Sequence, residues 1–390
     1  MPQLPPLVEP SGELSFDDVA RYSRHLIIPD VGTDGQRRLR NARVLVVGAG
    51  GLGSPALLYL AAAGVGTLGI VEDDQVETSN LQRQIIHGIS DVGRSKAQSA
   101  RESIHEINDG VEVRLHEFRL DSSNAVSLFE QYDLILDGTD NFATRYLVND
   151  AAVLAGKPYV WGSIYRFEGQ VSVFWENAPG GVGLNYRDLY PEAPPPGMVP
   201  SCAEGGVLGV LCASIGSVMV TEAIKLITGI GESLLGRLMV YDALAMNYRT
   251  LRVQRDPDRT PITELIDYEA FCGVVSDDVA DAADGSAVTP AELAAMMKSS
   301  DVALIDVREP VEWDIVRIAG ATLVPKGRIV SGDALAELPQ NSRIALYCKT
   351  GIRSAEALSV LKRAGFTDAV HLQGGILAWA KQIDPSLPQY

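Results

Sequence analysis

The residues best suited to chemistry in this chain form two groups, and the first is a glycine-rich turn. Gly48, Gly50 and Gly53 follow the apolar run 44–47 in the spacing Gly-x-Gly-x-x-Gly, with Gly51 between them. Such glycines allow a tight turn, let the backbone approach a phosphate and let a helix pack closely on a strand. The start of the next helix offers free N–H groups to an anion. The turn predicts a nucleotide-binding βαβ unit, and alone it favours an NAD-type oxidoreductase.

Charged residues beyond the turn favour a nucleoside triphosphate instead. Glu72 follows a second apolar run about 20 residues on, where such folds bind a ribose. Arg83 and Lys96 come next as cations, and Asp140 and Asn141 follow a further buried run. Each of these alone could be a surface charge or a helix cap. Together, cations that stabilise a polyphosphate and a carboxylate that holds Mg²⁺ predict Mg-ATP, with Asp140 as the magnesium ligand.

The second group surrounds Cys348, which stands between the apolar run 343–347 and a predicted helix. Loop N–H groups can converge on the sulfur, and Lys349 and Arg353 add positive charge. Such surroundings lower a thiol pKa from ~8.5 to roughly 3.5–7.5. The Cys-x4-Arg spacing is one residue shorter than that of a phosphatase loop, so we expect it to hold sulfur rather than phosphate. Cys348 is therefore a predicted nucleophile, and a buried strand-end cysteine is the alternative.

The composition limits the kind of protein that carries these groups. A chain of 390 residues exceeds one usual core, and 46% hydrophobic with 21% charged residues is typical of a folded protein. The net charge of −17 argues against a nucleic-acid or anionic-membrane partner. The apolar run 207–220 is too short and interrupted to span a bilayer. With few cysteines and no signal peptide expected, we predict a cytoplasmic protein.

The order of these segments predicts an α/β fold with two domains. We expect a Rossmann-like ATP-binding domain with a mixed sheet extension over 15–270, and a small α/β domain over 288–390. A Pro-rich, flexible N-terminus over 1–14 and an acidic linker over 271–287 flank the first domain. Thr289 is expected to cap the first helix of the second domain.

Taken together, the motifs of residues 15–270 resemble the MoeB/ThiF family of ubiquitin-activating-like adenylyltransferases. The shared signatures occur in one order along the chain: Arg21-Tyr22-x-Arg24, Gly50-Gly51-Leu52-Gly53, Ala63-Gly64-Val65-Gly66, Ser79-Asn80-Leu81-x-Arg83-Gln84, Lys96, Asp140-Asn141, Glu168-Gly169-Gln170 and Cys202-x-x-Gly205-Gly206.

The resemblance implies ATP-dependent adenylation of the C-terminal Gly-Gly carboxylate of a ubiquitin-fold sulfur-carrier protein. Arg24 would contact a phosphate across a homodimer interface, although on sequence alone it could belong to a solvated basic edge. Residues in the nucleotide site would be Gly48, Gly50, Gly51, Gly53, Glu72, Ser79, Asn80, Arg83, Lys96, Asp140 and Asn141, with Glu72 on the ribose.

The chain departs from the family at a structural zinc. Relatives carry two C-x-x-C pairs, but here Asn185 and Asp188 stand at the first position and the stretch 256–261 has no cysteine. We predict no structural zinc, with the loop held by packing and by Pro191, Pro194, Pro195 and Pro196. Cys202 precedes a helix, where a thiol pKa is lowered; in relatives this position is sometimes a thiol partner in sulfur transfer, and a buried structural cysteine is the alternative.

Residues 288–390 resemble a single rhodanese domain. The matching motifs are Asp306-Val307-Arg308-Glu309, the loop from Cys348 to Arg353, and Leu372-x-Gly374-Gly375-x-x-x-Trp379. The resemblance implies a persulfide on Cys348, loaded by a donor such as a cysteine desulfurase or thiosulfate. The fusion resembles MoeZ-type proteins, so sulfur would replace AMP to give a thiocarboxylate for molybdopterin (molybdenum cofactor), cysteine or related sulfur biosynthesis.

Two alternatives remain on sequence alone. One is an NAD-dependent oxidoreductase with an accessory domain, and the other is a non-catalytic scaffold for the carrier protein. Hydride transfer without ATP–pyrophosphate exchange would favour the first, and loss of all exchange would favour the second.

Overall fold

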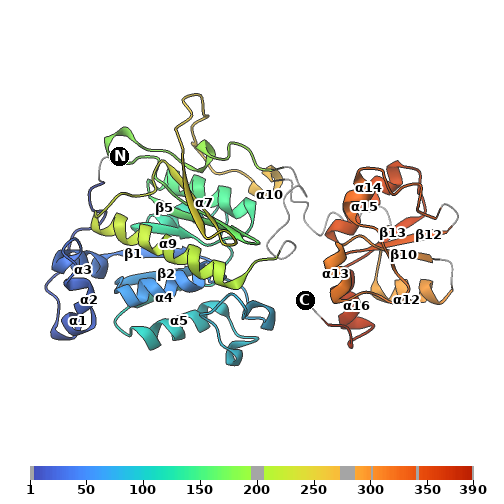
Figure 1. The fold of residues 1–390 in the computed structure, drawn as a ribbon, viewed down its shortest axis with the longest axis horizontal. Coiled ribbons are helices and arrows are strands. Elements are labelled where there is room, and N and C mark those ends of the chain that lie inside the picture. Colours follow the sequence, from blue (N-terminus) through green and yellow to red (C-terminus); the bar gives the residue numbers. More distant parts are fainter. Residues whose placement is uncertain (1–3, 195–205, 273–285, 300–301, 340–341, 389–390) are drawn as a thin grey trace. The chain divides into compact units, whose positions relative to one another are not determined.

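The computed structural model describes residues 4–194, 206–272, 286–299, 302–339 and 342–388 (Figure 1). It divides into two compact units, Met1–Gly273 and Val274–Tyr390, which we describe separately.

An eight-stranded sheet organises the N-terminal unit, in the order β3-β2-β1-β4-β5-β6-β7-β8. The strands from β3 to β5 are parallel and the strands from β6 to β8 are added antiparallel. The predicted Rossmann-like fold with a mixed extension is therefore confirmed. The strand bounds are β1 Arg43–Val47, β2 Thr67–Val71, β3 Glu112–His116, β4 Leu134–Asp137, β5 Tyr159–Tyr165, β6 Glu168–Phe174, β7 Arg237–Asp242 and β8 Asn247–Arg252.

Helices cover both faces of this sheet because the connections from β1 to β2 and from β4 to β5 run in opposite directions across it. One group packs α3, α4, α5 and α9 together, and the other packs α6, α7 and α10 (Figure 1). The helix bounds are α1 Phe16–Arg21, α2 Ser23–Leu26, α3 Gly32–Asn41, α4 Gly53–Ala63, α5 Lys96–Ile107, α6 Ala125–Phe129, α7 Phe142–Leu154, α9 Gly209–Thr228 and α10 Tyr268–Phe271.

Among the described residues, α9 alone is long and apolar enough to raise the question of a membrane span. The run expected to stop near residue 220 continues to Thr228. Leu211, Cys212, Ile215 and Met219 are all buried in the main core, and α9 packs against α4 and β5. This burial is that of a core helix.

The prediction of a flexible N-terminus is wrong for the part that the structure describes. The backbone N–H of Leu7 donates to Leu226 O at 2.9 Å, and Val8 is buried in the core. Arg38 donates to the carbonyl of Val8. Proline content suggested a loose tail, but two apolar side chains and these bonds attach it to the domain. Ser15 caps α1, since its side chain accepts the backbone N–H of Asp18.

The C-terminal unit contains a five-stranded, wholly parallel sheet in the order β11-β10-β12-β13-β9, with an apolar core cluster on each face. Thr289 caps its first helix as predicted. The bounds are β9 Ala287–Val288, α12 Pro290–Lys298, β10 Val302–Asp306, α13 Pro310–Ile315, β11 Thr322–Leu323, α14 Lys326–Val330, β12 Arg343–Tyr347, α15 Ile352–Arg363, β13 Ala369–Leu372 and α16 Gly375–Gln382.

Both ends of the stretch 271–287, predicted as an acidic linker, belong to regular elements. Phe271 belongs to α10, and Ala287 pairs with His371 in the second sheet. Residues 273–285 lie outside the described part of the chain.

We predict that Val8→Ser lowers the free energy of unfolding of the N-terminal unit by about 1–3 kcal/mol, because it places a hydroxyl in the core and removes apolar burial. Val19→Ser is the control, since Val19 is exposed on α1. Urea denaturation measures both, and equal midpoints for the two variants would contradict the packed position of Val8.

Candidate functional site

A cavity of about 460 Å³ lies where the carboxyl ends of β1, β2 and β4 meet. Ligands of open α/β sheets bind at this edge. Eight of the predicted nucleotide-site residues line the cavity: Gly48, Gly50, Gly51, Glu72, Arg83, Lys96, Asp140 and Asn141.

The glycine turn is built by direct backbone packing. Gly48 has φ +90°, which favours glycine, and a Cβ on Gly53 would overlap the Gly48 carbonyl oxygen. A Cβ on Gly51 would lie 2.8 Å from the sulfur of Cys212 in α9. Gly53 thus does not line the cavity; it lets α4 start close against the strand.

Glu72 stabilises the glycine turn by a hydrogen bond to its backbone. The carboxylate, 9% exposed, accepts the backbone N–H of Ala49 at 2.9 Å and that of Asp74 at 3.0 Å. Each carboxylate oxygen can still accept a second hydrogen bond. Glu72, Asp73 and Asp74 also form the one group of acids, within the described ranges, close enough to share a cation.

Lys96 and Arg83 bring positive charge to the cavity. Lys96 is the first residue of α5; its side chain is 8% exposed and its Nζ lies 2.8 Å from Asp74 Oδ2. Arg83 donates to Ser79 O at 3.1 Å, and its backbone N–H donates to Asn80 O at 3.0 Å. Ser79 and Asn80 do not line the cavity, so they position Arg83.

The start of α7 forms the opposite wall of the cavity. Asn141 caps this helix by accepting the N–H of Thr144 at 2.8 Å, and Asp140 is exposed beside it. Arg145 also lines the cavity but was not predicted. Its guanidinium donates to Thr139 O at 3.3 and 3.4 Å. Its position four residues after Asn141, one turn along the same helix face, was a signal in the sequence.

Two further polar groups, Gln84 and Asp137, lie at this edge of the sheet. Gln84 lines the cavity, and its buried Oε1 has no hydrogen-bond partner among the described residues. Asp137 Oδ1 accepts both the N–H and the hydroxyl of Thr139, while Oδ2 is buried without a partner in the described chain. Burial raises the pKa of Asp137, against the opposing effect of Thr139. The unpartnered Oε1 of Gln84, in a polar cavity, favours a bound ligand, so the donor set fits a magnesium nucleotide.

The remaining predicted residues of the first domain lie elsewhere. Arg24 is exposed on α2 and does not line the cavity. Cys202 lies outside the described residues.

The second site is the loop that begins at Cys348, directly after β12. Cys348 is buried, and its Sγ accepts the backbone N–H of Gly351 at 3.1 Å and the hydroxyl of Ser354 at 3.6 Å. Gly351 has φ +107° and leads directly into α15. The expected donation of a loop N–H to sulfur at a helix start is therefore present.

The segment from β13 to α16 clamps this loop. Ile376 N–H donates to Cys348 O at 2.9 Å, and Leu377 N–H donates to Lys349 O at 3.2 Å. A Cβ on Gly375 would overlap these same two carbonyls. Gly375 is thus required by close backbone contact, while a Cβ on Gly374, which has φ +68°, would meet the Ala378 side chain.

Arg353 was expected to add positive charge near the thiol. It instead forms two hydrogen bonds to Glu312 of α13, at 2.7 and 2.8 Å, with both side chains largely buried. The acid offsets the charge of Arg353 and fixes its guanidinium. The sequence analysis assigned no role to Glu312.

A buried ion pair supports α13. Arg308 and Asp306 are both fully buried, with Nη2 and Oδ2 2.6 Å apart, and Arg308 also donates to Val316 O at 2.7 Å. The guanidinium lies over the Tyr347 ring. The Asp306-Val307-Arg308-Glu309 motif therefore has a structural role beside the sulfur loop.

These two sites agree with the comparisons with known proteins. Residues 22–262 match the ThiF family, and residues 289–382 match the rhodanese-like domain. The chain therefore belongs to the ThiF family and carries a C-terminal rhodanese-like domain. The resemblances found in its motifs are confirmed.

Relatives share this domain composition. The chain is 73% identical over 388 residues to the probable adenylyltransferase/sulfurtransferase MoeZ of Mycobacterium tuberculosis, covering 99% of each. It is 40% identical to the adenylyltransferase and sulfurtransferase MOCS3 of Drosophila grimshawi, covering 97% of this chain and 87% of that one. It is 53% identical to the sulfur carrier protein adenylyltransferase of Thermus thermophilus, covering 66% of this chain and 98% of that one.

Solved structures share the fold of the first unit. The crystal structure of E. coli MccB with ATP matches with a TM-score of 0.53 at 21% identity, covering 62% of this chain and 73% of that one.

We predict that Arg308→Ala destabilises the C-terminal unit by about 3–5 kcal/mol, because it leaves the Asp306 carboxylate buried without its cation. Arg343→Ala, which breaks the exposed pair with Asp368, should cost less than about 1 kcal/mol. Denaturant unfolding of the full chain, monitored with a spectroscopic probe in the C-terminal unit, measures both free energies. Similar losses for the two variants would contradict the structural role of the buried ion pair.

Proposed function

We propose that the N-terminal unit adenylates the C-terminal Gly-Gly carboxylate of a ubiquitin-fold sulfur-carrier protein, and that the C-terminal unit transfers sulfur to it from a Cys348 persulfide. The chain is an adenylyltransferase and sulfurtransferase, as its relatives are named. The single observation that carries the first half is the cavity in which Lys96, Arg83 and Asp140 meet the glycine turn.

In the first step the carrier carboxylate attacks the α-phosphorus of ATP. A bond forms between the carboxylate oxygen and phosphorus, and the bond to the β-phosphate breaks, releasing pyrophosphate. Lys96 and Arg83 stabilise the negative charge that moves onto the departing phosphates. Glu72 accepts a ribose hydroxyl while it braces the turn, and Gln84 Oε1 is free to accept a further donor from the nucleotide.

Asp140, assisted by the acids at the end of β2, would hold Mg²⁺, which neutralises phosphate charge when it is bound. These side chains follow β2 and β4, which flank β1 at the edge of the sheet where the triphosphate is expected.

In the second step the persulfide sulfur of Cys348 attacks the acyl carbon. A carbon–sulfur bond forms, the carbon–oxygen bond to AMP breaks, and AMP departs with the electron pair. A second thiolate then attacks Cys348 Sγ, which releases the thiocarboxylate and leaves a disulfide. Cys202 is the candidate for that thiol. The N–H of Gly351 stabilises negative charge on the Cys348 sulfur before the persulfide forms.

This chemistry requires a sulfur donor and a pathway that uses the thiocarboxylate. A cytoplasmic cysteine desulfurase or thiosulfate would load Cys348, and the thiocarboxylate would supply molybdopterin, cysteine or a related sulfur product. The two alternatives from the sequence are not retained, because the relatives are named as adenylyltransferases and the cavity contains cations and acids suited to a triphosphate.

We predict that Lys96→Met lowers carrier-dependent ATP–pyrophosphate exchange by about 10²–10³-fold, because it removes a buried cation from the departing phosphates. Cys348→Ala should retain the exchange but lose thiocarboxylate formation. Arg94→Ala, in an exposed ion pair next to the same helix, is the control and should retain both. Thiocarboxylate formation at the normal rate by Cys348→Ala, with a persulfide donor present, would exclude the second step.

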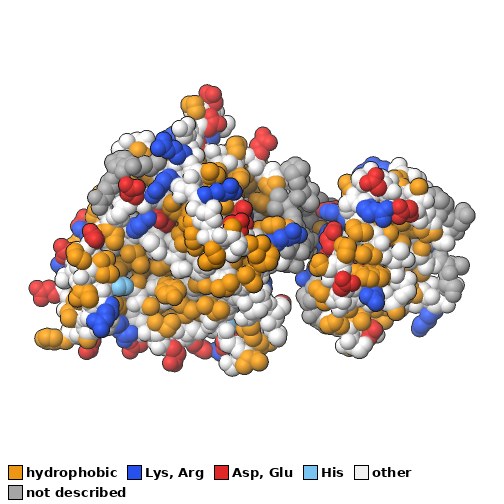
Figure 2. Space-filling model, in the orientation of Figure 1, with side chains coloured by type: hydrophobic (Ala, Val, Ile, Leu, Met, Phe, Trp, Pro, Cys, Tyr) orange, Lys and Arg blue, Asp and Glu red, His pale blue; other side chains and the backbone are white. Residues whose placement is uncertain are grey.

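We also propose that Arg24 acts in a homodimer, on the phosphates of the partner subunit. Arg24 lies outside its own cavity, and Ile27 and Ile28 beside it are exposed. Figure 2 shows apolar side chains gathered over α4 and α9, of which Tyr59 and Val210 are exposed. Apolar surface of this kind is typical of an interface.

Complementation tests this arrangement. Arg24→Ala and Lys96→Met are expected to be inactive alone, while their co-expressed mixture should recover about a quarter of wild-type exchange, since half of the dimers are mixed and each mixed dimer has one complete site. No recovery in mixed dimers would place Arg24 with its own subunit's cavity.

A further inference from the structure

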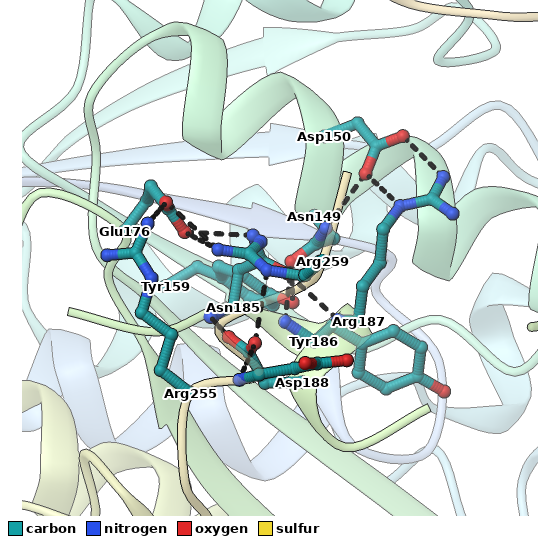
Figure 3. Close-up of polar contacts among 11 residues, drawn as sticks. Asn149, Asp150, Tyr159, Glu176, Asn185, Tyr186, Arg187, Asp188, Arg255 and Arg259 are labelled. Carbon is teal, nitrogen blue, oxygen red and sulfur yellow. Dashed lines mark hydrogen bonds and ion pairs between the residues drawn. The ribbon is translucent and has the colours of Figure 1, made fainter. Parts of the chain in front are cut away.

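A guanidinium occupies the centre of a polar cluster in the N-terminal unit, away from the nucleotide cavity (Figure 3). Arg259 Nη2 donates to both carboxylate oxygens of Glu176, at 3.0 and 2.8 Å, and Arg259 Nε lies 3.0 Å from Asp188 Oδ1. The side chains are 9%, 16% and 0% exposed, respectively. One cation therefore bridges two largely desolvated carboxylates.

The bridge joins three stretches that are distant in the sequence. Glu176 follows β6, Asp188 ends the turn Tyr186–Asp188, and Arg259 follows β8. Asp188 Oδ1 also accepts the backbone N–H of Asp256 at 3.0 Å, and Arg255 donates to Glu176 at 3.0 Å. In the described chain, the segment after β8 is held to this turn by these bonds and not by strand pairing.

The turn itself is bound to α7. Tyr186 N–H donates to Asn149 Oδ1 at 2.8 Å, and Arg187 forms two hydrogen bonds with buried Asp150, at 3.0 and 2.7 Å. Tyr268 of α10 donates to the same carboxylate at 2.7 Å. The cluster therefore connects α7, whose first turn lines the cavity, with the last helix of this unit.

This cluster lies where the family resemblance places a structural zinc, and its residues do not fit that ion. Asn185 and Asp188 replace the first thiolate pair, and the second stretch supplies Arg259. Zinc in such structural sites takes four nitrogen or sulfur donors. Here the oxygens of Asp188 accept the backbone N–H groups of Asn185 and Asp256, and Arg259 Nε lies 3.0 Å from Asp188 Oδ1 as an ion pair without a hydrogen bond. A positive charge therefore fills the position between the segments.

We infer that Arg259 is the structural cation of this domain, and that its guanidinium performs the cross-link that a thiolate-bound zinc would otherwise provide. A planar guanidinium carries five donors in a fixed fork, so it can bind two carboxylates in defined directions as a metal ion does. Unlike a zinc site, the cross-link has no thiolates to oxidise and nothing for a chelator to remove. The inference is independent of the proposed catalytic steps.

The sequence analysis expected packing and prolines to hold this loop in place of zinc, and the ion pairs correct that expectation. Packing does contribute, because Tyr186 is buried among the rings of Tyr146, Trp161 and Phe174. Pro191 is exposed, Pro194 is partly buried, and Pro195 and Pro196 lie outside the described residues. The ion pairs were not expected, because their partners are more than one element apart.

Metal content and thermal unfolding of the purified full-length chain test the inference. We expect no stoichiometric zinc, and a melting temperature that a strong chelator leaves unchanged. Arg259→Ala should lower the melting temperature by about 10 °C, because it leaves the buried Asp188 carboxylate without a cation and leaves Glu176 with only the exposed Arg255. Arg255→Ala is the matched control, since its exposed guanidinium makes one bond to the same Glu176, and it should shift the transition by less than about 2 °C.

Two further measurements keep the test decisive if Arg259→Ala does not fold. Arg259→Lys keeps the positive charge without the planar guanidinium. Its melting temperature should lie below that of the wild type and, if Arg259→Ala folds, above that of Arg259→Ala. In a cycle with Glu176→Ala on the Arg259→Lys background, the double variant should lose less than the sum of the single losses. One zinc per chain with unfolding by the chelator, or strictly additive losses, would overturn the inference.

Discussion

The structure of the nucleotide-binding unit depends on backbone meeting backbone at the glycine turn. Gly53 lies against the Gly48 carbonyl, and the backbone of Gly138, after β4, lies against both. Any side chain at Gly53 would separate the strand from its helix. This contact keeps the turn close to the ends of β1, β2 and β4. The acids and cations that follow these strands therefore share one cavity.

Both sites use the same physical solution, a parallel strand that ends in a glycine-containing loop before a helix. In the first unit the loop faces a cavity lined by four cations and four acids, so it offers both charges that a magnesium polyphosphate needs, within a chain of net charge −17. In the second unit the loop N–H of Gly351 donates to a sulfur instead. One chain thus activates an acid in one unit and supplies sulfur from the other.

Local patterns in the sequence were sufficient for the parts of the fold that depend on neighbouring residues. The glycine turn, the strand ends and the Cys348 loop all follow from short segments with defined spacing. Partners distant in the sequence were missed: Glu312 for Arg353, and Glu176 for Arg259. The N-terminal segment was misjudged for the same reason, since composition does not show that Val8 finds a place in a core formed much later in the chain.

The most direct test of the account is a crystal structure of the chain with magnesium and a non-hydrolysable ATP analogue. We expect the triphosphate along the glycine turn beside Arg83 and Lys96, the ribose at Glu72, and the metal on Asp140. A nucleotide bound at another surface, or a cavity that stays without density at saturating analogue, would contradict the central claim that this edge of the sheet is the adenylation site.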